Sequence, residues 1–406
     1  MGRSLFSVRR ATPTLDWVGS ARYPLTARER WIFRVSHSLL DWTKMADPDM
    51  EIVELEVGGF EKVVRGEDHA AGFRGIIAVH NTTLGPALGG MRMWDYSDWD
   101  DAQRDVLRLA EGMTYKSAIA RCGLGGGKSV VLGDSKTGKS EALFRFMGRL
   151  VDSLGGAYIT AEDVGTSVTD MDVLARETPF VAGRAKEVGG SGDPSPYTAL
   201  GTFLAIELSL RERFGPDAKL AGRTVAVQGL GHVGYWLCKH LHQAGAKLVV
   251  TDLHRDRIQR VVREFDAEIV ELDDIFGVAC DVFAPCALGA GLNDDTIPRL
   301  RAHVVCGAAN NQLAEARHAS ALQARGILYA PDYVVNGGGI LNISAELGEA
   351  GYDDRRADQL VQTVASSLER VFEEARRQEI TTADAARACA EEALREGRAR
   401  EDSARA

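Results

Sequence analysis

The feature that most constrains the fold of this chain is a glycine turn placed between a strand and a helix. Residues 229–234 read Gly-Leu-Gly-His-Val-Gly, which fits the pattern G-x-G-x-x-G. The apolar run 224–227 predicts a strand directly before the turn, and the pattern of 235–244 predicts a helix after it. Such glycines permit a tight turn, and the helix N-terminus offers free N–H groups to a pyrophosphate. We therefore predict a doubly wound α/β domain that binds a dinucleotide through Gly229, Gly231 and Gly234.

An acidic residue follows at the distance that dinucleotide-binding units require. Asp252 ends the next predicted strand, about 20 residues beyond the turn. Its carboxylate would accept hydrogen bonds from the ribose hydroxyls and would repel a 2′-phosphate. This predicts NAD rather than NADP as the cofactor. The alternative is a glycine turn in some other doubly wound fold.

The length of 406 residues suggests two domains and a tail. Strand and helix patterns alternate from about residue 50, which favours α/β architecture, and a Gly/Pro cluster at 189–196 indicates a linker. We predict four segments, which are an N-terminal extension (1–48), a substrate and catalytic domain (49–193), a Rossmann NAD-binding domain (194–337) and a helical segment that packs back on the catalytic domain (338–406).

Composition argues against several classes of function. The net charge of −10 disfavours binding to nucleic acid or to an anionic membrane, because both need a basic surface. No run of about 18 apolar residues is present, so we expect no membrane-spanning helix. The six cysteines form no CxxC pair, and no metal-ligand constellation stands out. This pattern favours reduced thiols in a cytoplasmic protein that holds no metal.

Two lysines flank a glycine-rich stretch. Lys116 is expected at the end of a helix that begins near Asp98, and Lys128 follows three glycines and enters a strand. Glycines leave room for a ligand against the backbone. A lysine in a poorly solvated pocket near a second cation loses its proton easily, as a general base must. Two surface lysines beside a flexible loop would give the same pattern.

A carboxylate stands just beyond another strand. Asp163 follows the predicted strand at 158–160. An acidic residue at the carboxyl end of a strand is well placed to face a cleft. Taken alone, it could equally be the N-cap of a helix.

One motif favours a different class of protein. Residues 133–140 read Gly-Asp-Ser-Lys-Thr-Gly-Lys-Ser, which matches the phosphate-binding pattern G-x-x-x-x-G-K-[ST]. The interior of this loop is polar rather than glycine-rich, and no strand ending in a magnesium-binding aspartate follows at a natural place. A solvated connection is the better interpretation, and a P-loop nucleotide-binding protein is the alternative.

These stretches together resemble the Glu/Leu/Phe/Val dehydrogenase family, and within it the leucine dehydrogenase branch. The resemblance runs in register over roughly residues 50–395. It is carried by TTLGPALGGMRMW, LRLAEGMTYKSA, LGGGKSVVLGD, YITAEDVGT, DPSPYTALG, VAVQGLGHVGYWLCKHLH, DVFAPCALGAGLN, CGAANNQL and APDYVVNGGGILN. It implies an NAD-dependent enzyme that oxidatively deaminates an amino acid to a 2-oxo acid and ammonia, as a homo-oligomer.

The resemblance also implies roles for single residues. Lys116 would hold the substrate carboxylate, Lys128 would be the base that activates water, and Asp163 would carry protons to and from the nitrogen. Gly89 and Gly90 would let the backbone approach the substrate. The residues implied at the nicotinamide end of the cofactor are Thr198, Ala287, Asn310 and Asn311.

The implied pocket for the substrate side chain is apolar. It is formed by Leu88, Ala161, Ile340 and Ile343. The glutamate branch has a lysine at the position of Leu88 and a serine at that of Ile343, so a buried glutamate carboxylate would lack a partner here. The pocket favours leucine, valine or another short branched chain. Phenylalanine or another aromatic amino acid is the alternative, because Gly337 replaces the alanine usual in the family and loosens the backbone beside the pocket.

Overall fold

The fold was determined as a computed structural model that describes residues 50–347 and 351–405. The predicted N-terminal extension, 1–48, lies outside the described residues. Among the described residues, the first sheet has the strand order β1-β2-β3-β5-β4-β6. Its antiparallel half joins β1, β2, β3 and β5, and β4 pairs in parallel with β5 and β6. The strands are β1 (Met50–Glu54), β2 (Lys62–Asp68), β3 (Phe73–Asn81), β4 (Ala87–Trp94), β5 (Gly125–Leu132) and β6 (Tyr158–Glu162).

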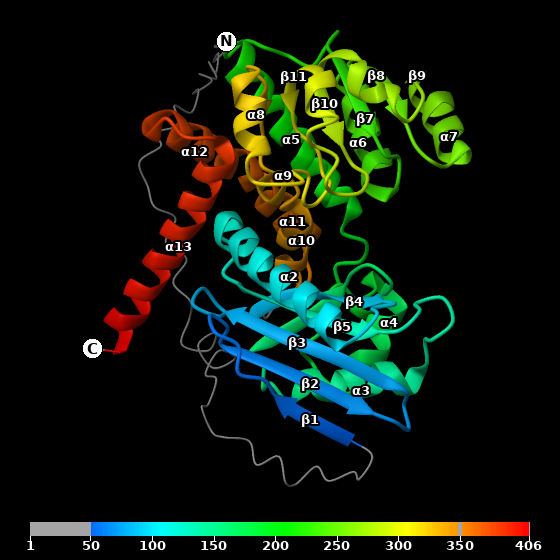
Figure 1. The fold of residues 1–406 in the computed structure, drawn as a ribbon, viewed down its shortest axis with the longest axis vertical. Helices are drawn as coiled ribbons and strands as arrows, with labels where there is room; N and C mark the ends of the chain where they lie inside the picture. The colour runs from blue at the N-terminus through cyan, green and yellow to red at the C-terminus, as the bar shows by residue number, and fades with distance from the viewer. Residues whose placement is uncertain (1–49, 348–350, 406) are drawn as a thin grey trace, which may run out of the picture. The chain divides into compact units, whose positions relative to one another are not determined.

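Helices cover both faces of this sheet. Ile76 and Val130 share an apolar cluster with Val106 of α2, whereas their neighbours Ile77 and Val131 share another with α3. Successive residues of a strand point to opposite faces, so a strand buried on both faces reads as a continuous apolar run. Figure 1 shows α2 lying along the sheet over β5 and β3. The helices are α2 (Trp99–Ala120), α3 (Glu141–Asp152) and α4 (Val168–Leu174).

The second sheet has the order β12-β11-β10-β7-β8-β9, and its neighbouring strands all pair in parallel within the described chain. This is the doubly wound order, in which ligands bind at the carboxyl ends of the central strands. The strands are β7 (Thr224–Gln228), β8 (Lys247–Thr251), β9 (Glu268–Ile269), β10 (Ala279–Pro285), β11 (Arg301–Val305) and β12 (Leu328–Tyr329). The helices between them are α6 (His232–Gln243), α7 (Arg255–Phe265) and α8 (His318–Ala324), and α5 (Ser195–Phe214) precedes β7.

The C-terminal helices return towards the first sheet. α13 packs against α2 (Figure 1), and the Ser367 hydroxyl in α12 donates to the Ile119 carbonyl at the end of α2, at 3.0 Å. The Glu346 carboxylate in α10 accepts hydrogen bonds from the backbone N–H groups of Gly183 and Ser191, both at 2.9 Å. These helices are α9 (Asp332–Val335), α10 (Gly338–Glu346), α11 (Asp354–Val361), α12 (Thr363–Gln378) and α13 (Thr382–Arg405).

The predicted α/β class with a doubly wound second sheet is confirmed, with several corrections to the elements. α2 continues to Ala120, so Lys116 lies inside the helix rather than at its end. The glycines before Lys128 belong to β5, which begins at Gly125, and α6 begins at His232, inside the glycine fingerprint. Strands β2 and β4 were not predicted, because charged residues and glycines interrupt their apolar patterns, and neither was β9, which has only two residues. No helix in the described part of the chain is long and apolar enough to cross a membrane.

Candidate active site

Two of the predicted catalytic residues meet at the first sheet. Lys128 lies in β5, and Asp163 directly follows β6, with β4 between the two strands. The Lys128 Nζ atom lies 2.9 Å from Oδ2 of Asp163. The Lys128 side chain is 6% exposed and that of Asp163 is 24% exposed, so the pair is largely withdrawn from water. A charge pair in such a place interacts more strongly than one at the surface.

The Asp163 carboxylate is kept ionised by its neighbours. Burial alone would raise its pKa, but the positive charges of Lys128 and Arg92 outweigh burial and hold the pKa below the usual range of an aspartate. The backbone N–H of Asp163 donates to the Thr166 hydroxyl at 2.9 Å. The N-cap of the following helix, α4, is Ser167, so the interpretation of Asp163 as a helix cap is wrong.

Lys116 lies in α2 and is partly buried. Burial lowers its pKa to about 8; the carboxylate of Asp332 opposes this shift, and the charge of Lys128 adds to it. Burial in turn raises the pKa of Asp332, against the hydrogen bonds that its carboxylate accepts from the backbone of Gln312 and Tyr333. Lys116 is thus a buried lysine beside a second cation, the arrangement that the sequence analysis expected to lower a lysine pKa.

The glycines around these residues allow other parts of the protein, rather than a ligand, to lie against the backbone. A Cβ atom on Gly90 would lie 2.7 Å from Cβ of Asp163, and one on Gly89 would lie 1.8 Å from the Gly127 carbonyl oxygen. A Cβ atom on Gly126 would lie 2.1 Å from the backbone nitrogen of Thr114 in α2. The space that the sequence analysis assigned to a ligand is thus occupied by Asp163, β5 and α2. The glycines let α2 approach β5 closely enough for Lys116 to act on Lys128.

The glycine turn after β7 fits a dinucleotide. Gly229 has a φ of +93°, which favours glycine, and a Cβ atom on Gly234 would lie 2.0 Å from the Gly229 carbonyl oxygen. A Cβ atom on Gly231 would meet only a guanidinium nitrogen of Arg257, at 3.9 Å, so the space beside Gly231 is open. Gly231 is also the N-cap of α6 and has no capping side chain. The first N–H groups of α6 therefore remain available to a phosphate.

Asp252 stands one residue beyond β8 and holds this turn. Its Oδ2 accepts a hydrogen bond from the Leu230 N–H at 2.6 Å, and its Oδ1 accepts one from the His254 N–H at 2.7 Å. The side chain is 6% exposed. A carboxylate has about four lone-pair sites, so two such bonds leave acceptor capacity for a ribose hydroxyl.

The loop after β10 lies against the glycine turn. A Cβ atom on Gly229 would lie 2.9 Å from the backbone nitrogen of Ala287. The Asn311 carbonyl accepts a hydrogen bond from the Ala290 N–H at 2.7 Å, and Asn311 itself has a φ of +51°. Oδ1 of Asn310 accepts a hydrogen bond from Asn336 at 2.7 Å. The structure thus brings three of the four residues implied at the nicotinamide end to the carboxyl edge of the second sheet.

The fourth of these residues, Thr198, lies in α5 beside α10. Its hydroxyl donates to the Pro194 carbonyl at 3.1 Å. A Cβ atom on Gly339 would lie 2.7 Å from that hydroxyl, and one on Gly338 would lie 3.1 Å from the Thr198 Cα. The paired glycines therefore let α10 pack directly on α5 at Thr198.

Three of the four implied pocket residues belong to one apolar cluster. Leu88 and Ile340 are buried within it, and Ile343 packs against it. Ala161 is also buried and is the register partner of Gly90 on the neighbouring strand. Gly337 has a φ of −65°, which alanine also adopts freely. The backbone conformation at this position therefore does not require glycine and gives no reason for the loosening that was expected there.

The phosphate-loop motif at 133–140 is engaged in structural contacts. Nζ of Lys139 lies 2.6 Å from the Asp170 carboxylate. The Ser140 hydroxyl caps α3 by accepting from the Leu143 N–H at 3.1 Å. The loop is mostly exposed, so the two residues that would bind phosphate and magnesium serve as an ion pair and a helix cap.

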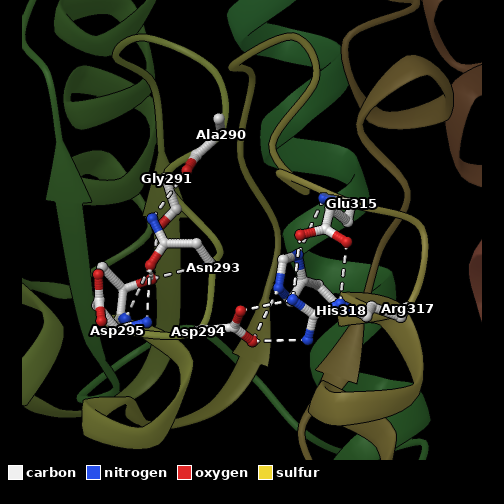
Figure 2. A network of polar contacts seen from close by, with 9 residues as sticks. Ala290, Gly291, Asn293, Asp294, Asp295, Glu315, Arg317 and His318 are labelled. Carbon is white, nitrogen blue, oxygen red and sulfur yellow. Dashed lines mark hydrogen bonds and ion pairs between the residues drawn. The ribbon is translucent and has the colours of Figure 1, made fainter.

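A cluster of two carboxylates and a histidine lies in the loops of the second sheet (Figure 2). One potential ligand atom from each of Asp294, Glu315 and His318 lies within 4.8 Å of the other two, and each side chain also makes hydrogen bonds to neighbouring groups. Arg317 bonds both Asp294 and Glu315, and Nδ1 of His318 accepts the Glu315 N–H at 2.9 Å. The remaining ring nitrogen faces Asp294 at 3.3 Å. These contacts connect the loop at Asp294 to the start of α8.

The sequence analysis missed Arg92. Its Nε donates to Oδ2 of Asp163 at 3.1 Å, and its Nη1 donates to Oδ2 of Asp105 at 2.9 Å. The spacing of Gly90 and Arg92 could have indicated it. Residues two apart on a strand lie on the same face of the sheet, so Arg92 shares a face with Gly90, beside which Asp163 lies.

Comparison with known proteins gives these features a family. Residues 59–180 match the model of the Glu/Leu/Phe/Val dehydrogenase dimerisation domain, and residues 189–254 and 250–400 match that of Glutamate/Leucine/Phenylalanine/Valine dehydrogenase. The leucine dehydrogenase of Bacillus cereus is 51% identical over 346 residues, which cover 85% of this chain and 94% of that protein. The phenylalanine dehydrogenase of Lysinibacillus sphaericus is 44% identical, with 83% and 89% covered.

A solved structure agrees with these sequence matches. The crystal structure of L-tryptophan dehydrogenase from Nostoc punctiforme aligns with a TM-score of 0.73 and 41% identity, over 84% of this chain and 97% of that one. The matched models cover the second sheet and all of the first sheet except β1, and the glycine turn, Asp252 and the Lys128–Asp163 pair lie within the matched ranges. The chain therefore belongs to the Glu/Leu/Phe/Val dehydrogenase family and is an NAD-dependent amino-acid dehydrogenase.

Proposed function

We propose that this enzyme reversibly converts a branched-chain or small apolar L-amino acid, NAD and water into the 2-oxo acid, ammonia and NADH. The observation that carries the proposal is the buried contact of 2.9 Å between Lys128 and Asp163, with Lys116 close enough to influence both. When bound, NAD accepts the hydride that leaves the substrate α-carbon. The other steps are binding and proton transfer, which this chain's own residues perform.

Lys116 binds the α-carboxylate of the substrate in this proposal. Its ammonium is partly buried, so water competes weakly for it, and a carboxylate beside it gains a strong charge-assisted hydrogen bond. Asp332 shares this surrounding and limits the fall in the Lys116 pKa. Lys116 thereby retains enough positive charge near neutral pH to orient the substrate.

Lys128 and Asp163 move the protons. Loss of hydride leaves an imine at the substrate α-carbon, and water must then attack that carbon. Before hydride leaves, the Asp163 carboxylate takes a proton from the substrate ammonium. Lys128, in its neutral form, then takes a proton from the attacking water, and Asp163 returns its proton to the departing nitrogen. Because their side chains are hydrogen-bonded to each other, a proton can pass between them without entering bulk solvent.

We infer the substrate preference from the apolar side chains of the implied pocket. Leu88 and Ile340 are almost wholly buried, and Ile343 packs against the same cluster. A distal carboxylate placed there would be desolvated without a cation, so glutamate should be rejected. The higher identity to the leucine dehydrogenase than to the phenylalanine dehydrogenase supports a branched aliphatic substrate. Phenylalanine is the second candidate, since a relative that uses it is 44% identical.

We also propose that the enzyme is a homo-oligomer in the cytoplasm. The matched model of residues 59–180 is described as a dimerisation domain, which supports self-association. The six cysteines are all free, which suits a reducing compartment. Sedimentation equilibrium of the purified chain tests the first part, because a monomer at working concentration would contradict it.

The test is formation of NADH from L-leucine, L-valine, L-isoleucine, L-phenylalanine and L-glutamate, compared as kcat/KM. We expect the branched amino acids to lead and glutamate to give no turnover. The Lys128→Ala variant should lose about 10²- to 10⁴-fold in kcat while it binds NADH normally. Lys139→Ala, which alters the phosphate-loop motif, should leave kcat unchanged. Activity led by phenylalanine would overturn the substrate assignment, and full activity of Lys128→Ala would overturn the mechanism.

A further inference from the structure

We propose that Arg92 is a positioning residue for this reaction: it holds the Asp163 carboxylate in its orientation beside Lys128. The inference rests on the proposed function, because it assumes that Asp163 transfers protons. It adds a residue of β4 to the catalytic group and gives that residue a task distinct from contact with the substrate.

The first part of the argument is the sharing of one oxygen atom. Oδ2 of Asp163 accepts from Nε of Arg92 at 3.1 Å and lies 2.9 Å from Nζ of Lys128. Two cations therefore meet at the same atom, and the orientation of the carboxylate is fixed by both. A carboxylate held by Lys128 alone could rotate about its side-chain bonds and offer either oxygen.

The second part is that Arg92 is itself anchored. Its Nη1 donates to Oδ2 of Asp105 at 2.9 Å, and the buried Tyr96 hydroxyl donates to the same oxygen at 2.7 Å. Oδ1 of Asp105 accepts from Arg108 at 2.9 Å. The planar guanidinium thus bridges two carboxylates, which a single ammonium group cannot do with the same geometry.

The third part is the balance of charge around Asp163. The positive groups are Arg92 from β4, Lys128 from β5 and, farther away, Lys116 from α2. The preceding strand β6 contributes the neighbouring Glu162 and the Tyr158 hydroxyl. Arg92 is one of only two cations in direct contact with Asp163 among the described residues, so its removal should favour protonation of Asp163.

The experiment compares Arg92→Gln, Arg92→Lys and the wild-type enzyme. For Arg92→Gln we expect kcat to fall about tenfold or more. We also expect the apparent pKa on the acid side of the kcat/KM–pH profile to rise by about one unit. Arg92→Lys keeps the positive charge but cannot contact Asp163 and Asp105 in the same geometry. Its kcat should therefore fall, while the acid-side pKa of the kcat/KM–pH profile stays unchanged. The NADH dissociation constant and the melting temperature are measured for each variant.

Arg104→Gln is the matched control. Arg104 lines the same cavity as Arg92, but within the described chain its guanidinium contacts only the exposed carboxylate of Asp101, at 3.3 Å. This variant should keep the wild-type kcat and pH profile. If Arg92→Gln has the wild-type profile, or if Arg92→Lys keeps the wild-type kcat, the positioning role is overturned. The Arg92→Lys arm still decides the matter if Arg92→Gln does not fold.

Asp163→Asn separates failure of this inference from failure of the proposed function. An impaired Asp163→Asn enzyme beside a fully active Arg92→Gln enzyme would refute the role of Arg92 alone. A fully active Asp163→Asn enzyme would refute the proposed mechanism, and the role of Arg92 with it.

Discussion

A single lysine, Lys116, shows how the surroundings of one residue set its chemistry. Burial brings its pKa to about 8, and the nearby Lys128 pushes in the same direction, while Asp332 opposes them. The sequence could predict a confined lysine from the neighbouring glycines. It could not predict the influence of Asp332, which lies more than two hundred residues away in the sequence and is placed near Lys116 by the position of α9 in the fold.

The lowered pKa of Lys116 predicts how binding of a carboxylate depends on pH. Below about pH 8 the group is an ammonium and attracts the carboxylate, and above that pH it becomes neutral and the attraction is lost. The dissociation constant of 4-methylpentanoate, an unreactive analogue, should therefore rise as the pH passes from 7 to 9.5 in the presence of NADH. A constant that does not change with pH would contradict this. Lys116→Met should bind the analogue weakly and with no such dependence.

At the scale of elements, the glycine-rich segments determine how closely strands and helices pack. The sequence analysis predicted an alternation of helices and strands where the apolar periods are clear, but it missed the mostly buried strand β4. It placed Gly125–Gly127 before the strand, because glycine is uncommon within strands. In the structure these glycines are part of β5, since only they allow α2 and Tyr158 to lie so near. Such a reason depends on the neighbours in space and leaves no trace in the local pattern.

Gly90→Ala and Gly112→Ala make a matched pair of substitutions that tests this view. A Cβ atom on Gly90 would lie 2.7 Å from both Cβ of Asp163 and the Glu162 carbonyl oxygen, whereas one on Gly112 in α2 meets nothing within 4 Å. Gly90→Ala should displace Asp163, lower kcat by at least tenfold and cost about 1–3 kcal/mol of unfolding free energy. Gly112→Ala should keep kcat and raise stability by about 0.5–1 kcal/mol. Denaturant unfolding and steady-state kinetics measure both, and equal behaviour of the two variants would contradict the argument.

At the scale of the whole described chain, the two sheets are joined by the segments that follow the second one. α13 lies on α2, Ser367 bonds Ile119, and Glu346 bonds Gly183 and Ser191. The two-sheet architecture was predictable from the alternation of strands and helices. The partners of the C-terminal helices were not, because an amphipathic helix shows which face is buried but not what it is buried against. The division into domains at 49–193 and 194–337 remains our proposal.

These contacts predict that the two sheets unfold together. Calorimetry should show one transition for the chain, and NADH at about 100 times its dissociation constant should add about 2.7 kcal/mol of stability to all of it. Two transitions, of which NADH moves only one, would show that the sheets unfold independently. Glu346→Ala removes one of the connections and should broaden or split the transition.

The hydrogen bond from the Leu230 amide to Asp252 has a consequence for evolution and engineering. A change of nucleotide preference is usually sought by replacing the acidic residue that faces the ribose. In this enzyme Asp252, the residue that we propose for that role, also accepts hydrogen bonds from the amides of Leu230 and His254. An amide side chain at this position would satisfy only one of them with its oxygen and turn its NH₂ group towards the other. A lineage that adopted a phosphorylated nucleotide would first need another acceptor for this turn, so the preference for NAD is tied to the integrity of the fold around it.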